Sequence, residues 1–153
     1  MPTPVREEIV SRIATRIEAV ATGLGYAFER NRFVPIEEGE VPALVLFDGG
    51  EEVVDGDSGG LSRELGLEVE AFVTAATGAL LGAAVAEVAA RIRLAMRPDA
   101  AGLTVDGFAW DVKELAMTTP EIGRHAKARA FAAFTLEYVV VYQTAEFDPY
   151  ATS

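Results

Sequence analysis

Cysteine is absent from this chain of 153 residues, and histidine and tryptophan each occur once. A chain without cysteine has no disulfide, no thiolate metal site and no cysteine nucleophile. Basic residues are also few, because 13 lysines and arginines stand against 24 aspartates and glutamates, a formal net charge of −11. This charge disfavours non-specific binding to nucleic acid or to an anionic membrane surface.

Long apolar runs are missing as well. The longest uncharged run, 71–86, is rich in alanine, glycine and threonine. It falls short of the about twenty apolar residues that a membrane helix needs. The chain opens with MPTPVREE, which is charged from the start and unlike a signal peptide. We therefore expect a soluble protein that is made in the cytoplasm and has no membrane segment.

Hydrophobic residues make up 50% of the chain, a large share for a soluble monomer. The excess predicts either a large core or a buried interface between subunits. The length suits one domain spanning 1–153, since a chain of this size can bury a core of its own. No internal repeat or linker divides the sequence.

Hydrophobic periodicity predicts an α+β fold with the order α-β-β-α-β-β. One helix is expected to begin at Pro4 after a Thr3 cap and to end at Gly23 and Gly25, and a second to run over 78–96 after a Thr77 cap. Strands are expected over 43–47, 61–74, 103–117 and 129–144, with a loop over 48–60 and a turn over 118–127. These elements predict a mainly antiparallel sheet of four strands with the helices packed on it.

The last strand, RAFAAFTLEYVVVYQT, is expected to organise the sheet. Its alternate residues from Ala130 to Tyr142 suit full burial, and the opposite set suits a partly covered face. The strand is longer than most, so part of it should project beyond the packed body. The strand over 61–74 alternates as clearly and places Glu64, Glu68 and Glu70 on one face.

Two motifs in the predicted loop resemble chemical sites. Residues 56–60 read GDSGG, as around a trypsin-like serine nucleophile, but the single His125 follows the serine, against that family's order. Asp55 and Asp57 start like a calcium loop whose later carboxylate positions are glycines. A solvated hairpin tip is favoured, with loose calcium binding as the alternative. No P-loop, dinucleotide-binding, HExxH or CxxC motif is present, so neither a cofactor nor a catalytic residue is predicted.

Charge is segregated along the chain. Between Arg32 and Arg63 the sequence has acidic residues and no basic one: Glu37, Glu38, Glu40, Asp48, Glu51, Glu52, Asp55 and Asp57. The one basic cluster is Arg124, His125, Lys127 and Arg129. A head-to-tail contact between identical subunits joins different surfaces and would bring these charges together. We therefore predict that Glu51, Glu52, Asp55 and Asp57 face Arg124, Lys127 and Arg129 of a neighbour; the alternative is a solvated acidic face.

Small residues form a smooth flank on the second helix: Ala79, Gly82, Ala83, Ala86 and Ala90. Such a flank permits close approach of a sheet or of a neighbouring subunit, and we predict Ala79 and Ala83 as interface residues.

The features in this order resemble the tail terminator family of long-tailed phages, the minor-tail-protein-U-like proteins, which also occur in gene transfer agents. The resemblance runs from Val5 to Tyr150. It is carried by the first helix, the segment Arg30-Asn31-Arg32, the strands PALVLFDGG and EVEAFVTAATG, the alanine-rich helix, and the ending FTLEYVVVYQT followed by Asp148-Pro149-Tyr150.

This resemblance implies a virion structural protein of the tail neck, assembled in the host cytoplasm. It implies a hexameric ring that binds the last ring of the tail tube, stops polymerisation and meets the head connector. DNA would pass through its lumen without specific binding, and the family has no catalytic residues. Phe147 and Tyr150 are expected to contact the tube. The alternatives are another neck or tail-completion protein, or a small metal- or ligand-binding α+β oligomeric enzyme.

Overall fold

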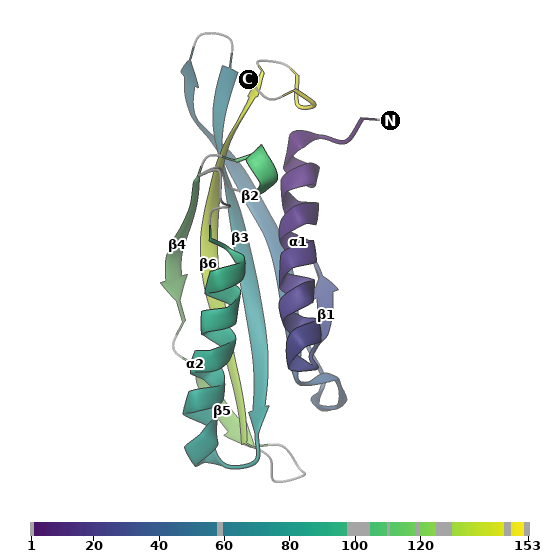
Figure 1. The fold of residues 1–153 in the computed structure, drawn as a ribbon, viewed down its shortest axis with the longest axis vertical. Coiled ribbons are helices and arrows are strands. Elements are labelled where there is room, and N and C mark those ends of the chain that lie inside the picture. The colour runs from purple at the N-terminus through teal and green to yellow at the C-terminus, as the bar shows by residue number, and fades with distance from the viewer. Residues whose placement is uncertain are drawn as a thin grey trace.

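The computed structural model describes residues 2–57, 60–97, 105–109, 111–118, 120–124, 130–145 and 148–151. Two helices lie on one face of a twisted sheet whose strands run along the long axis of the molecule (Figure 1). The elements follow the chain in this order: α1 (Val5–Leu24), β1 (Ala27–Arg30), the 3₁₀ helix η1 (Glu38–Glu40), β2 (Ala43–Asp57), β3 (Gly60–Ala75), α2 (Gly78–Ala95), the 3₁₀ helix η2 (Val105–Gly107), β4 (Asp111–Met117), β5 (Glu121–Arg124) and β6 (Ala130–Ala145). The predicted α+β class is confirmed.

The sheet has six strands in the described part of the chain, where the sequence predicts four. Their order is β1-β2-β3-β6-β4, and β5 pairs with the other end of β6. Only β1 and β2 pair in parallel; the remaining pairs are antiparallel. The sequence predicts an irregular link or a short extended segment over 26–40 and a turn over 118–127, because β1 and β5 have four residues each, too few to show a period. The third predicted strand begins at Asp111, since the residues before it form η2, and Trp110 lies outside the described residues.

The predicted loop over 48–60 is wrong. β2 continues to Asp57 and β3 starts at Gly60, and these two residues are Cα partners. Register shifts after Asp48 and after Val53 fit the glycine-rich sequence into the ladder, as β-bulges do. Figure 1 shows that this hairpin projects beyond the N-terminal end of α1. We call its two paired ends, 50–57 and 60–64, the hairpin arm.

The helix boundaries follow local chemistry. The Thr77 hydroxyl accepts a hydrogen bond from the backbone N–H of Leu80 at 3.4 Å, which confirms the predicted cap of α2. α1 starts one residue later than predicted, because Pro4 is extended and its carbonyl accepts from the Glu8 N–H. Gly23 remains helical, and α1 ends at Gly25, whose φ of 73° is the left-handed conformation that glycine adopts without strain.

The core lies between the helices and one face of the sheet. In β6 every second residue from Ala130 to Thr144 is buried, so the predicted alternation is confirmed. The helices add their apolar stripes, with Ile9, Ile13 and Ile17 from α1 and Val88 and Ile92 from α2 fully buried. Neither α1 nor α2 lies on the other face of the sheet, where Pro35 and Ile36 of the segment after β1 line a hollow with Phe47 and Phe72.

Candidate assembly surfaces

On the face of the sheet that points away from the helices, carboxylates are interspersed with apolar residues, among them Val45, Phe47, Phe72 and Phe131. Residues that stand directly opposite one another on neighbouring strands share a face. By this register the face holds Glu52, Glu64, Glu68, Glu70, Asp111 and Glu137. Lys113 is the single basic residue on it within the described parts of β2, β3, β4 and β6. We call this surface the acidic sheet face.

Like charges meet directly on the acidic sheet face. Glu52 stands opposite Glu64, and Glu68 stands opposite Glu137. Among the described residues no ion pair joins any of these four carboxylates to a basic group. Burial, with the charge of Glu68 as a second cause, raises the pKa of Glu70. Like charges directly opposite one another on neighbouring strands destabilise the fold.

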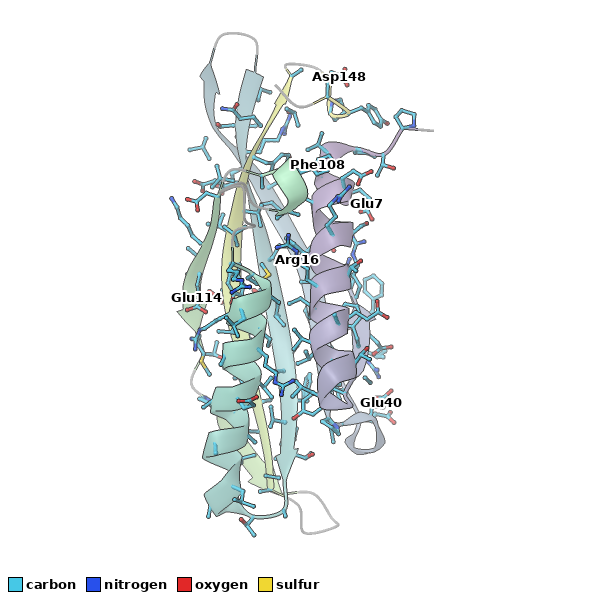
Figure 2. All side chains as sticks on the ribbon, viewed as in Figure 1. Glu7, Arg16, Glu40, Phe108, Glu114 and Asp148 are labelled. Carbon is cyan, nitrogen blue, oxygen red and sulfur yellow. The ribbon has the colours of Figure 1, made fainter. Side chains whose placement is uncertain are left out.

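The helix layer on the opposite side carries arginines. A groove of about 460 Å³ between α1 and α2 is lined by Arg16, Arg91 and Arg97 with Val20 and Leu94 among the apolar residues. The Arg16 guanidinium donates to the carbonyl of Ala95 at 3.4 Å, where α2 ends, and so ties the two helices together (Figure 2). The subunit therefore has a carboxylate-bearing side and an arginine-bearing side.

Glu51 lies at the base of the hairpin arm and is half-buried, although the sequence predicts it at a solvated tip. The Arg63 guanidinium donates to its carboxylate at 2.9 Å, and Arg6 reaches it at 3.4 Å. The Tyr142 hydroxyl donates to the same carboxylate. Arg63 also donates to the hydroxyl of Thr144 at 3.1 Å. These contacts join α1, β2, β3 and β6 and hold the arm in place.

A second group of ion pairs continues this network toward β1. The two terminal N–H groups of the Arg30 guanidinium, on Nη1 and Nη2, donate to the two carboxylate oxygens of Glu7 at 2.8 and 2.9 Å, and its Nε–H donates to Asp48 at 3.3 Å. The hydrogen bonds from Arg30 lower the pKa of Glu7. Burial alone raises the pKa of Asp48, but hydrogen bonds from Asn31 and Arg30 outweigh it and lower the pKa overall. Sequence reasoning missed this network because its members lie up to 91 residues apart, as with Tyr142 and Glu51.

The remaining predicted site residues are scattered. Glu52 is exposed, as are Ala79 and Ala83 on the outer side of α2. Tyr150 is 50% exposed, and the carbonyl of its neighbour Pro149 accepts from the Val5 N–H at 2.9 Å, so the C-terminal segment lies beside the start of α1. Figure 2 shows Asp148 and Glu7 at the same end of the molecule and Glu40 at the other.

Several predicted residues lie wholly or partly outside the described residues. Lys127, Arg129, His125 and Phe147 are outside them; for Asp55, Asp57 and Arg124 only the backbone is described. The backbone of Asp55 and Asp57 belongs to β2 and not to a loop, and the alternative of loose calcium binding there stays a prediction. β5, which ends at Arg124, lies at the opposite end of the molecule from the hairpin arm (Figure 1). The charge contact between neighbouring subunits stays a prediction.

The described residues contain no group of three or more carboxylate, histidine or cysteine side chains placed to hold a metal ion. Neither helix among them combines the length and the apolar composition needed to cross a membrane.

No protein-family model matches the chain, and no curated protein matches it. Among solved structures, it is similar to a chain in the virion of a native gene transfer agent particle. The two are 16% identical, with a TM-score of 0.37, over 85% of this chain and 91% of that one. A likeness this distant carries no argument about what the chain does.

Proposed function

We propose that this chain is a structural subunit of a phage-like virion that acts as a tail terminator. Copies form a ring, of six by the sequence resemblance, which caps the tail tube, stops its polymerisation and joins it to the head connector. The observation that carries the proposal is the acidic sheet face, an exposed strand surface whose carboxylates repel one another within the subunit. The stability lost to this repulsion is explained if the face has a role in the assembled ring.

In a ring with the acidic sheet face turned inward, the wall of the lumen carries negative charge, as DNA does. Glu64, Glu68 and Glu137 come from the two central strands, so they would face the middle of the lumen. The phosphate backbone is attracted to lysine and arginine, which this face lacks in the described strands except at Lys113. DNA then passes through without binding, while the arginines of the helix layer point outward.

The end that carries the hairpin arm is the surface that meets the tube. Val53 and Val54 on the arm are 56% and 55% exposed, and Pro149, next to Tyr150, is hydrogen-bonded to the start of α1 below the arm. Exposed apolar side chains fit a protein partner better than bulk water. Phe33 and Val34 after β1 are more exposed, at 99% and 62%, so the arm is assigned to the tube because it also projects from the body (Figure 1). The opposite end, with β5 and η1, is left for the head connector.

The proposal is tested by comparing virions that are assembled with and without this chain. Without the chain, tail tubes should grow past their normal length and heads should remain unjoined, as counted by electron microscopy. Restoring the chain should restore both, whereas Val53→Asp/Val54→Asp should fold and fail to cap. Tails of normal length on joined heads in its absence would contradict the proposal and favour another neck component or the enzyme alternative.

A further inference from the structure

At the level of the hairpin arm, two strands at the edges of the sheet, β2 and β4, have no neighbouring strand on their outer side in the described part of the chain. On one side, β1 pairs only with residues from Ala43 to Leu46 of β2. Above that, Arg6 donates to the carbonyl of Gly49 at 2.9 Å, so the free edge of β2 begins at Gly50. On the other side, β4 pairs with β6 and with no other strand in the described part of the chain.

One rung of the ladder joins these edges. Glu52 is the Cα partner of Glu64, Glu64 of Val141, and Val141 of Asp111. At this rung the sheet therefore consists of four strands, β2-β3-β6-β4, and both outer ones lack a second neighbour within the described residues. Unpaired strand edges are templates for further pairing, and proteins cover, bend or join them.

The strand directions decide how two copies can meet. β2, β3, β6 and β4 alternate in direction, because each pair along the rung is antiparallel. When a second copy is placed beside the first in the same orientation, its β2 runs opposite to β4 of the first. The two edges then form a regular antiparallel pair, and the helices of both copies stay on one side of the joined sheet. A contact of this head-to-tail kind closes into a ring if its rotation closes.

We infer that copies of this chain join edge to edge, β4 of one copy pairing with Glu51–Val54 of the next. The ring then encloses a sheet that is continuous at the height of this rung, where the edges of β2 and β4 are paired, with the acidic sheet face along its inner wall. The two bulges in β2 suit this position, since bulges are frequent at the rims of barrels. This inference rests on the proposed ring and specifies the surfaces that build it.

Charge fixes the register of the pair. Lys113 pairs with Asp111 of its own strand at 3.4 Å, has a side chain that is 61% exposed and shares the acidic sheet face with exposed Glu52. If this rung continued without a shift into the next copy, Asp111 of one copy would stand opposite Glu52 of the other, and two like charges would meet. A stagger of two residues sets Lys113 there instead, and closed sheets require such a stagger between their strands. The β4 edge is fixed from behind, because Arg93 of α2 binds Glu114 at 2.8 Å (Figure 2).

The absence of cysteine makes a direct test available. In Glu52→Cys/Lys113→Cys the two thiols of one copy are three strand spacings apart, roughly 14 Å, too far for a disulfide within the chain. Mild oxidation should therefore give a ladder of covalent oligomers on a non-reducing gel that collapses on reduction. The matched control, Glu52→Cys/Glu18→Cys, puts the second thiol on the exposed side of α1 and should give no ladder. Circular dichroism should be unchanged in both, because all three positions are exposed.

Charge reversal supplies an independent readout. Lys113→Glu should weaken self-association up to about fivefold per contact, measured by sedimentation at low salt. Adding Glu52→Lys to the same chain exchanges the two charges and should restore it.

The outcomes separate this inference from the proposed function. The edge contact would be overturned if the chain forms oligomers but cysteine at Glu52 gives no covalent ladder with cysteine at Asp111, Lys113 or Leu115. The proposed ring would then still stand, with another interface. A strictly monomeric chain at every concentration would overturn the edge contact too. A ladder together with normal tails in particles lacking the chain would support the edge contact and overturn the terminator role.

Discussion

At the scale of single residues, Glu51 and Glu52 are adjacent in sequence and have opposite surroundings. Glu51 accepts hydrogen bonds from Arg63 and Tyr142, whereas Glu52 is exposed on the acidic sheet face. Glu51→Ala should lower the free energy of unfolding by about 1–3 kcal/mol, because it leaves half-buried donors unpaired. Glu52→Ala should change it by less than about 0.5 kcal/mol. Urea titration measures both, and equal losses would contradict the network.

The negative charge of Glu70 opposes folding. Its pKa is raised by burial and by Glu68, so the folded state disfavours its ionised form at neutral pH. Glu70→Gln should therefore stabilise the protein at pH 7 by about 0.2–1 kcal/mol. As the pH falls through the raised pKa, the wild type becomes neutral there and the gain should vanish. Thermal melts across pH test this, with exposed Glu18→Gln as the control that should show no gain.

Glu7 and Asp48 respond to acid in the other direction. Hydrogen bonds from arginines and Asn31 leave both with lowered pKa values in the folded state. Their contribution is complete above the unfolded pKa values, 4.5 and 3.8, and is lost as the pH falls through the lower folded ones. The free energy of unfolding should therefore drop below about pH 4.5. Arg30→Met should already be less stable at pH 7 and should lose less on acidification.

At the scale of elements, the sequence predicts what repeats locally. β6 and α2 are correct nearly to the residue because burial imposes a period of two on one and of about 3.6 on the other. The hairpin arm is missed because its glycines and aspartates are turn formers, and only pairing with β3 makes them a strand. Three carboxylates of the acidic sheet face are readable from β3 alone, whereas Glu137 and Asp111 join them only through the register. The ion-pair network depends on contacts between distant segments and leaves no local pattern.

Two adjacent glycines where the arm begins, Gly49 just before it and Gly50 at its first position, form a matched pair for testing the packing of β2. A Cβ at Gly49 would lie 3.3 Å from the carbonyl oxygen of Gly66, whereas one at Gly50 would meet nothing within 4 Å. Gly50→Ala should stabilise the protein by about 0.4–1 kcal/mol, since alanine restricts the unfolded chain. Gly49→Ala should gain less or destabilise, because the contact opposes the same entropic benefit. Equal changes in urea unfolding would show that the arm is looser than its ladder indicates.

At the scale of the whole molecule, the carboxylates on one face of the sheet predict that DNA does not bind in the lumen of the proposed ring. Glu64→Lys/Glu68→Lys puts two cations on the acidic sheet face and turns its contacts with Glu52 and Glu137 into pairs of opposite charge, so folding should be retained. The variant ring should retard duplex DNA in a gel at low salt where the parent ring does not, and salt should abolish the effect. Two matched changes outside the sheet, Glu8→Lys and Glu18→Lys, should retard DNA less, because their cations do not line the lumen. Equal retardation by both variants would place the lumen wall elsewhere.

The long pairing of β3 with β6 has a mechanical consequence. All residues from Gly60 to Ala75 are in register with β6, and their hydrogen bonds lie across the long axis of the molecule. A force along that axis, such as a tube pulling on the arm, loads every rung in shear at once. A force on β4 across the sheet peels a strand of seven residues rung by rung. The subunit is therefore stiff along its axis and compliant at its β4 edge, so under load a ring of such subunits should open at a β4 edge before any single subunit unfolds.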